Sequence, residues 1–93
     1  MDSAEVLLAL DGVYGRTQAQ RYVSKRFVDD LDRALAVFDG APDMQVVERW
    51  LSYLSQIAME MMQLPEKDAR HFHQVHVILC ERLLAYLKAG SES

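Results

Sequence analysis

The sequence has few of the residues that would tie it to a disulfide framework, a membrane or a nucleic acid. Cys80 is the single cysteine, so no internal disulfide can form and a reducing compartment is expected. The unbroken apolar runs are far shorter than the ~20 residues that a membrane-spanning helix requires. Lys and Arg number 10 against 14 Asp and Glu, and the resulting net charge of −4 is poorly suited to a polyanion such as DNA.

Composition and the first residues place the chain among cytoplasmic globular proteins. Apolar residues make up 51% of the sequence and charged residues 26%, the balance of a folded domain rather than a disordered one. Asp2 and Glu5 are acidic, whereas a secretory signal begins with basic residues. We therefore expect a single domain over residues 1–93, located in the cytoplasm, with no membrane association and no nucleic-acid partner.

Glycine and proline are also scarce, with four and two residues, and most of them mark the ends of predicted helices. Gly12 and Gly15 predict a break after a short helix over residues 3–10, because glycine is a poor helix former. Residues 40–42, Gly-Ala-Pro, end a second helix, and Pro65 suits the first turn of the last one. Long helices are expected over about residues 17–38, 43–63 and 65–88, followed by a frayed tail at 89–93.

Apolar residues at steps of three and four follow each long segment, the pattern of helices with one buried face. The second helix opens with a capping-box pattern, in which the Thr17 hydroxyl would cap the amide of Gln20. Short connections between long helices place neighbours antiparallel. We predict an all-α fold, a small antiparallel helical bundle of three long helices plus a short N-terminal helix.

The last helix carries more apolar surface than one neighbouring helix can cover. At about 100° per residue, a core stripe centred on Phe72 leaves Val77 and Leu84 about 120–140° away and Ile78 about 240° away. The N-terminal and second helices could cover these positions, or a second polypeptide could do so. We favour the second polypeptide, because a chain of 93 residues has few helices with which to surround one of its own.

Methionine gathers in the third helix, where its flexible side chain suits a surface that accepts varied partners. Met61 lies on the core seam and is expected to fill gaps there. Met59 and Met62 lie off the seam, and their spacing is compatible with either a contact role or a packing role. The predicted partner-binding residues are Met59, Met62, Val77, Ile78 and Leu84.

Three potential metal ligands, His73, His76 and Cys80, share one side of the last helix. A structural zinc ion needs a fourth ligand, which no second Cys/His pair supplies, and His71 is expected to point elsewhere. His76 is expected at a core position, as a neutral, hydrogen-bonded side chain. Cys80 and His76 also have the spacing of a nucleophile and its base, but burial among leucines would deny a substrate access. We expect no metal, no cofactor and no catalytic residue, and hence no enzyme.

We therefore expect a small intracellular protein-binding module that is dimeric when free. It would serve as an adaptor, a secretion- or assembly-type chaperone, or an inhibitor of a larger protein, and its partner could supply an amphipathic helix. The alternative is a dimeric helix-turn-helix-like DNA-binding regulator, in which a helix starting at Thr17 would present Arg21 and Lys25 to DNA. The long turn before Thr17 and the acidic residues after Lys25 weigh against that alternative.

Overall fold

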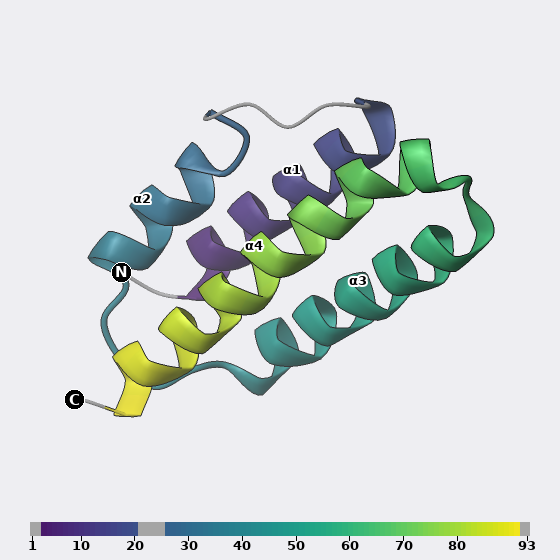
Figure 1. Cartoon of the computed structure of the whole chain (residues 1–93). Helices are drawn as coiled ribbons and strands as arrows, with labels where there is room; N and C mark the ends of the chain where they lie inside the picture. The colour runs from purple at the N-terminus through teal and green to yellow at the C-terminus, as the bar shows by residue number, and fades with distance from the viewer. Residues whose placement is uncertain (1–2, 21–25, 92–93) are drawn as a thin grey trace.

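The computed structural model describes residues 3–20 and 26–91, and these fold into helices joined by short connections (Figure 1). No strand is present within these two ranges, so the predicted all-α class is confirmed. The helices are α1 Ser3–Ala19, α2 Asp29–Val37, α3 Met44–Gln63 and α4 Glu66–Ser91.

The first helix is longer than predicted. Instead of ending near residue 10, α1 continues through Gly12 and Gly15 to Ala19. Its buried side chains share one face and are fully shielded from solvent, so their burial outweighs a helix-propensity cost of about 1 kcal/mol for each glycine. These side chains are Val6, Leu10, Val13 and Thr17.

The second helix is shorter than the predicted 17–38, because α2 begins only at Asp29. Thr17 caps no new helix; its hydroxyl donates to the Val13 carbonyl at 2.8 Å within α1. The turn before α2 is stabilised by Arg16, whose guanidinium donates to the Phe27 carbonyl at 3.1 Å. A continuous helix would use that carbonyl for the amide of Leu31, so the side-chain bond favours the break.

Helices α3 and α4 lie close to their predicted positions. Asp43 caps α3 by accepting a hydrogen bond from the Gln45 amide at 2.8 Å. Before it, Gly40 has φ +123°, a left-handed conformation that a residue with a Cβ rarely adopts. The last helix, α4, extends to Ser91.

Two sets of contacts fix the ends of the helices relative to one another. The Tyr86 hydroxyl lies 2.7 Å from the Ser3 hydroxyl and accepts the Asp43 amide at 2.8 Å, so the starts of α1 and α3 meet the end of α4. At the other end, His71 donates through Nε2 to the Thr17 carbonyl at 3.2 Å, which joins the end of α1 to the start of α4. Figure 1 shows α4 lying across α1, with α2 and α3 to either side.

Trp50 is the largest fully buried side chain and lies between α3 and α4. Its indole Nε1 donates to the Leu79 carbonyl at 3.0 Å, and its ring stacks on Tyr86 with centroids 5.8 Å apart. The hydrogen bond satisfies a polar atom that burial would otherwise leave unpaired, and it fixes the register of the two helices.

A polar and aromatic cluster joins α1 to α3. The rings of Tyr14 and Tyr53 stack with centroids 4.1 Å apart. Asp11 accepts hydrogen bonds from the Tyr53 hydroxyl and from Arg49, the latter at 3.3 Å. Burial raises the pKa of both tyrosines, and the negative charge of Glu60 raises the pKa of Tyr14 further.

The Trp50 hydrogen bond leads to a first prediction. Replacing Trp50→Phe should lower the free energy of unfolding by roughly 1–3 kcal/mol, because it leaves a small void and removes the indole donor. Urea unfolding followed by circular dichroism measures this loss. Leu8→Ala, at a position 74% exposed on α1, should change stability by less than about 0.5 kcal/mol. Equal losses in the two variants would contradict the assigned role of Trp50.

The tyrosine pair predicts a loss of stability in alkaline solution. Because the folded state holds the Tyr14 and Tyr53 protons more tightly than the unfolded state does, the free energy of unfolding should fall as the pH rises past about 10. The double variant Tyr14→Phe/Tyr53→Phe should lose less stability between about pH 9 and 11 than the natural chain. Equal slopes in pH-dependent urea titrations would show that these hydroxyls do not contribute.

Candidate functional site

One side of α3 presents large apolar side chains to solvent. Met44, Leu51 and Met62 lie within about 20° of one another around the helix axis and are 65%, 49% and 86% exposed. Arg49 and Tyr53, which contact α1, lie about 140–180° away from Met44 on the same helix. The apolar stripe of α3 therefore points away from α1.

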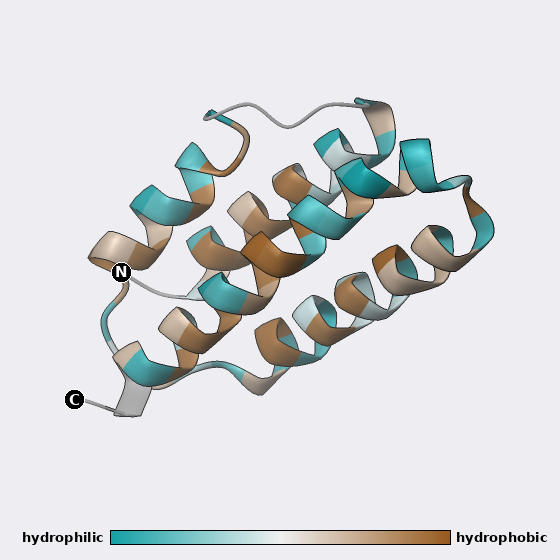
Figure 2. Ribbon diagram, in the orientation of Figure 1, coloured by the Kyte–Doolittle hydropathy of each residue, from teal (hydrophilic) through white to brown (hydrophobic). Residues whose placement is uncertain are grey.

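A second apolar stripe follows α4. Val77 and Leu84 share a side of this helix and are 42% and 59% exposed, and Leu87 beside them is 39% exposed. His71 and Arg82, which contact α1 and α2, lie about 120–160° away from these three residues. Both stripes therefore face outward from the same side of the α3–α4 pair, and apolar residues recur along both ribbons in Figure 2.

We call this surface the α3–α4 face and include Met59, which flanks the α3 stripe and is also exposed. Its members share a large apolar side chain, a position in α3 or α4, and an orientation away from α1 and α2. They are Met44, Leu51, Met59, Met62, Val77, Leu84 and Leu87.

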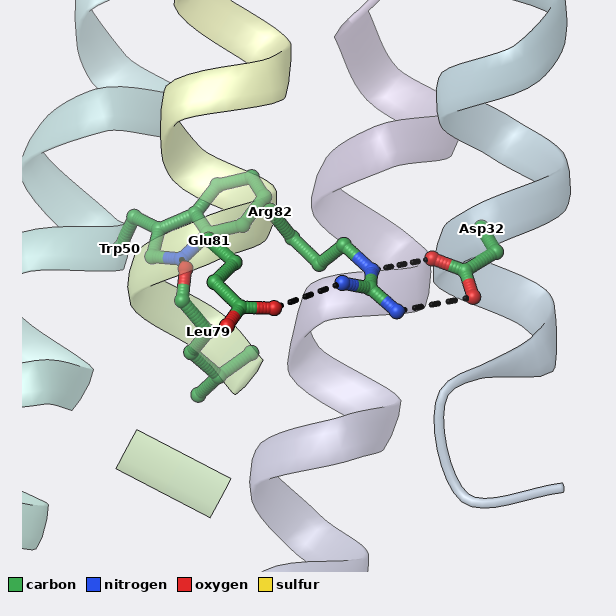
Figure 3. Close-up of polar contacts among 5 residues, drawn as sticks. All are labelled: Asp32, Trp50, Leu79, Glu81 and Arg82. Carbon is green, nitrogen blue, oxygen red and sulfur yellow. Dashed lines mark hydrogen bonds and ion pairs between the residues drawn. The ribbon is translucent and has the colours of Figure 1, made fainter. Parts of the chain in front are cut away.

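The opposite side of α4 is occupied by polar contacts to α2. Arg82 donates to Asp32 through Nε at 2.6 Å and lies 3.4 Å from Glu81, as Figure 3 shows. The hydrogen bond to Asp32 raises the pKa of the Arg82 guanidinium. Because these contacts hold α2 on one side of α4, α2 does not reach the α3–α4 face.

The predicted contact residues divide into two groups. Met59, Met62, Val77 and Leu84 are exposed, as a contact role requires. Ile78 is half-buried, packs against the chain's own core, and lies about 40° from Arg82 on the side that faces α2. The chain thus covers Ile78 itself, whereas Val77 and Leu84 stay uncovered.

The buried histidine is His71 and not His76, which corrects the expectation from helical spacing. His71 is 6% exposed and contacts the Thr17 carbonyl, whereas His76 is only half-buried. The reason is the length of α1, since a helix ending near residue 10 could not reach the first turns of α4. Cys80 Sγ lies 3.8 Å from His76 Nδ1. Within residues 3–20 and 26–91, no three His, Cys, Asp or Glu side chains are grouped as metal ligands.

Two hollows lie elsewhere on the molecule, and sequence reasoning missed both. One lies beside the α3–α4 turn, where Lys67 and Arg70 are balanced by Glu60 and Asp68. The other lies between α1 and α2 and is lined largely by small and apolar residues; its lining includes Ala4, Leu8, Ala9, Gly12, Ala34 and Val37. Predicting this second hollow would have required the correct ends of α1 and α2.

The DNA-binding alternative called for a helix that begins at Thr17, whereas Thr17 lies near the end of α1. Thr17 and Gln18 belong to the end of α1, and the Gln18 amide donates to Glu60 at 3.1 Å. Arg21 and Lys25 lie outside the described residues. The described helices also include none that is both long and apolar enough to span a bilayer.

Ile78 is packed against the core and Leu84 is exposed, and this difference leads to a stability prediction. Ile78→Ala should lower the free energy of unfolding by roughly 1–2 kcal/mol, because it removes atoms packed against the core. Leu84→Ala should change it by less than about 0.5 kcal/mol, because Leu84 has no such packing. Urea unfolding at a concentration low enough to keep the chain monomeric measures both values. A reversed order would place Ile78, rather than Leu84, on the contact surface.

The α3–α4 face is thus formed by exposed apolar residues of two neighbouring helices. The chain matches no protein-family model, no curated protein and no solved structure.

Proposed function

We propose that this chain is a non-enzymatic protein-binding module and that the α3–α4 face is its binding surface. The module would act in the cytoplasm as an adaptor, an assembly- or secretion-type chaperone, or an inhibitor of a larger protein. The single half-buried cysteine, Cys80, fits a reducing compartment. The proposal includes an antiparallel bundle as the scaffold, supported by the contacts at the two ends of α4.

The observation that carries the proposal is the shared orientation of the two apolar stripes. Single exposed apolar residues are common on soluble proteins, whereas a contiguous apolar surface marks a contact site. Val77 and Leu84 lie two helical turns apart on α4, and Leu51 and Met62 are exposed on the side of α3 that points the same way. The exposed Ser55 lies between Leu51 and Met62 on the same side of α3 and leaves room for a partner's side chains.

The apolar surface of the face is large enough to offset much of the cost of association. Its seven side chains are about half exposed on average. Covering them would contribute on the order of 5–10 kcal/mol, at roughly 1.5–3 kcal/mol for each side chain that becomes fully buried. Association itself costs on the order of 4–15 kcal/mol, so this chain's apolar surface about offsets that cost, and net affinity comes from the partner's own apolar surface and from polar contacts at the edge.

Site-specific photo-crosslinking in the cells that encode the chain tests this function. A photoreactive phenylalanine analogue at position 84 should yield a discrete crosslinked adduct, because Leu84 would be covered by the partner. The same analogue at position 8, where Leu8 is 74% exposed on α1, serves as the matched control and should yield none. An absence of adducts at position 84, or equal adducts at both positions, would rule out the α3–α4 face as the binding surface.

A further inference from the structure

We infer that the α3–α4 face is covered by a second copy of this chain, related to the first by a two-fold axis near Cys80. This inference rests on the proposed function, because it names the partner for the same surface. Three properties of the face support it: its apolar area, the spacing of its α4 residues, and its low charge.

The apolar area matches what a dimer of ordinary size buries. A fully exposed large aliphatic side chain presents roughly 60–120 Å² of apolar surface, so the seven half-exposed side chains offer roughly 250–450 Å². A standard interface buries about 800 Å² on each partner, of which about 500 Å² is apolar in a homodimer. The face can therefore supply most of the apolar part of such an interface.

The spacing along α4 is self-complementary. Val77 lies three residues before Cys80, and Leu84 lies four residues after it. When two copies of α4 cross in opposite directions with the axis beside Cys80, Val77 of one copy meets Leu84 of the other, and the reverse contact forms by symmetry. Each exposed apolar residue on this stretch of α4 is then covered by one of similar size.

The charge distribution also favours a second copy at this surface. A two-fold interface brings identical surfaces together, so like charges on it would repel. The outer surface of α2 carries Asp29 and Asp30, and the hollow between α1 and α2 is edged by Glu5 and by the Asp30–Arg33 ion pair. The α3–α4 face has an exposed carboxylate at Glu48, between Met44 and Leu51, and a second at Glu81, whose charge is offset by Arg82 at 3.4 Å. The α3–α4 face is thus better suited to self-association than the outer surface of α2, where Asp29 and Asp30 are adjacent.

Analytical ultracentrifugation tests the inference directly. At hundreds of micromolar the natural chain should sediment at about twice its 10.6 kDa mass. Leu84→Asp should raise the dissociation constant at least about 100-fold, because each dimer would bury two carboxylates. Leu8→Asp makes the same change on α1 and should leave the dimer intact. Leu84→Ser, with circular dichroism of each variant, separates loss of association from loss of folding.

Crosslinking through the native thiol tests the position of the axis. A short bismaleimide should join two copies through Cys80, the single cysteine of the chain. Moving the cysteine, with Cys80→Ala and Leu8→Cys together, should abolish this crosslink while the sedimenting mass stays that of a dimer.

The possible results separate the two proposals. A chain that stays monomeric at all concentrations, or a dimer unaffected by Leu84→Asp, overturns the second-copy inference. If position 84 then photo-crosslinks to a different protein, the proposed function stands and only the identity of the partner is wrong. Dissociation of the dimer as NaCl rises from about 50 to 500 mM would also overturn the inference, because apolar contacts are not screened by salt.

Discussion

The buried hydrogen bond from Trp50 to the Leu79 carbonyl is the contact on which the rest of the arrangement depends. It fixes α3 against α4 at mid-length, and Tyr86 then stacks on the same indole near the end of the pair. Once these two helices are in register, their remaining apolar residues divide between the side that α1 and α2 cover and the side that they leave open. The core and the α3–α4 face are consequences of one packing arrangement.

Sequence periodicity predicted the helices that are bounded by strong local signals and misplaced those that depend on distant contacts. Asp43 and Pro65 define the starts of α3 and α4 through local backbone chemistry, so both starts were predicted to within a residue or so. The glycines at 12 and 15 looked like a break, yet burial of one face of α1 overcomes them. The break instead follows Ala19, and the Arg16 guanidinium stabilises it by donating a hydrogen bond to the Phe27 carbonyl. That contact joins residues 11 positions apart and leaves no periodic signal.

The candidate face was predictable only in part, for a related reason. Helical spacing shows which residues of α4 share a side, but it does not say on which side each neighbouring helix lies. The helical spacing of α4 did not distinguish Ile78 from Val77 and Leu84, because all three lie outside its core stripe. The structure separates them, because α2, held by the Arg82–Asp32 ion pair, lies on the side of α4 that carries Ile78. The sequence did not predict the exposure of Met44, Leu51 and Leu87, because the apolar spacing of each helix is dominated by its buried stripe.

The Tyr86 hydroxyl, which joins Ser3 and Asp43, has a consequence for how the molecule forms during translation. Ser3 and Tyr86 are separated by 83 positions, so this end of the fold stays open until the last turns of α4 have left the ribosome. Until then α1 lacks its anchor at that end, and the apolar side of α3 has no α4 to cover it. A nascent chain therefore exposes these apolar side chains to other proteins until Tyr86 has emerged and can reach Ser3 and Asp43.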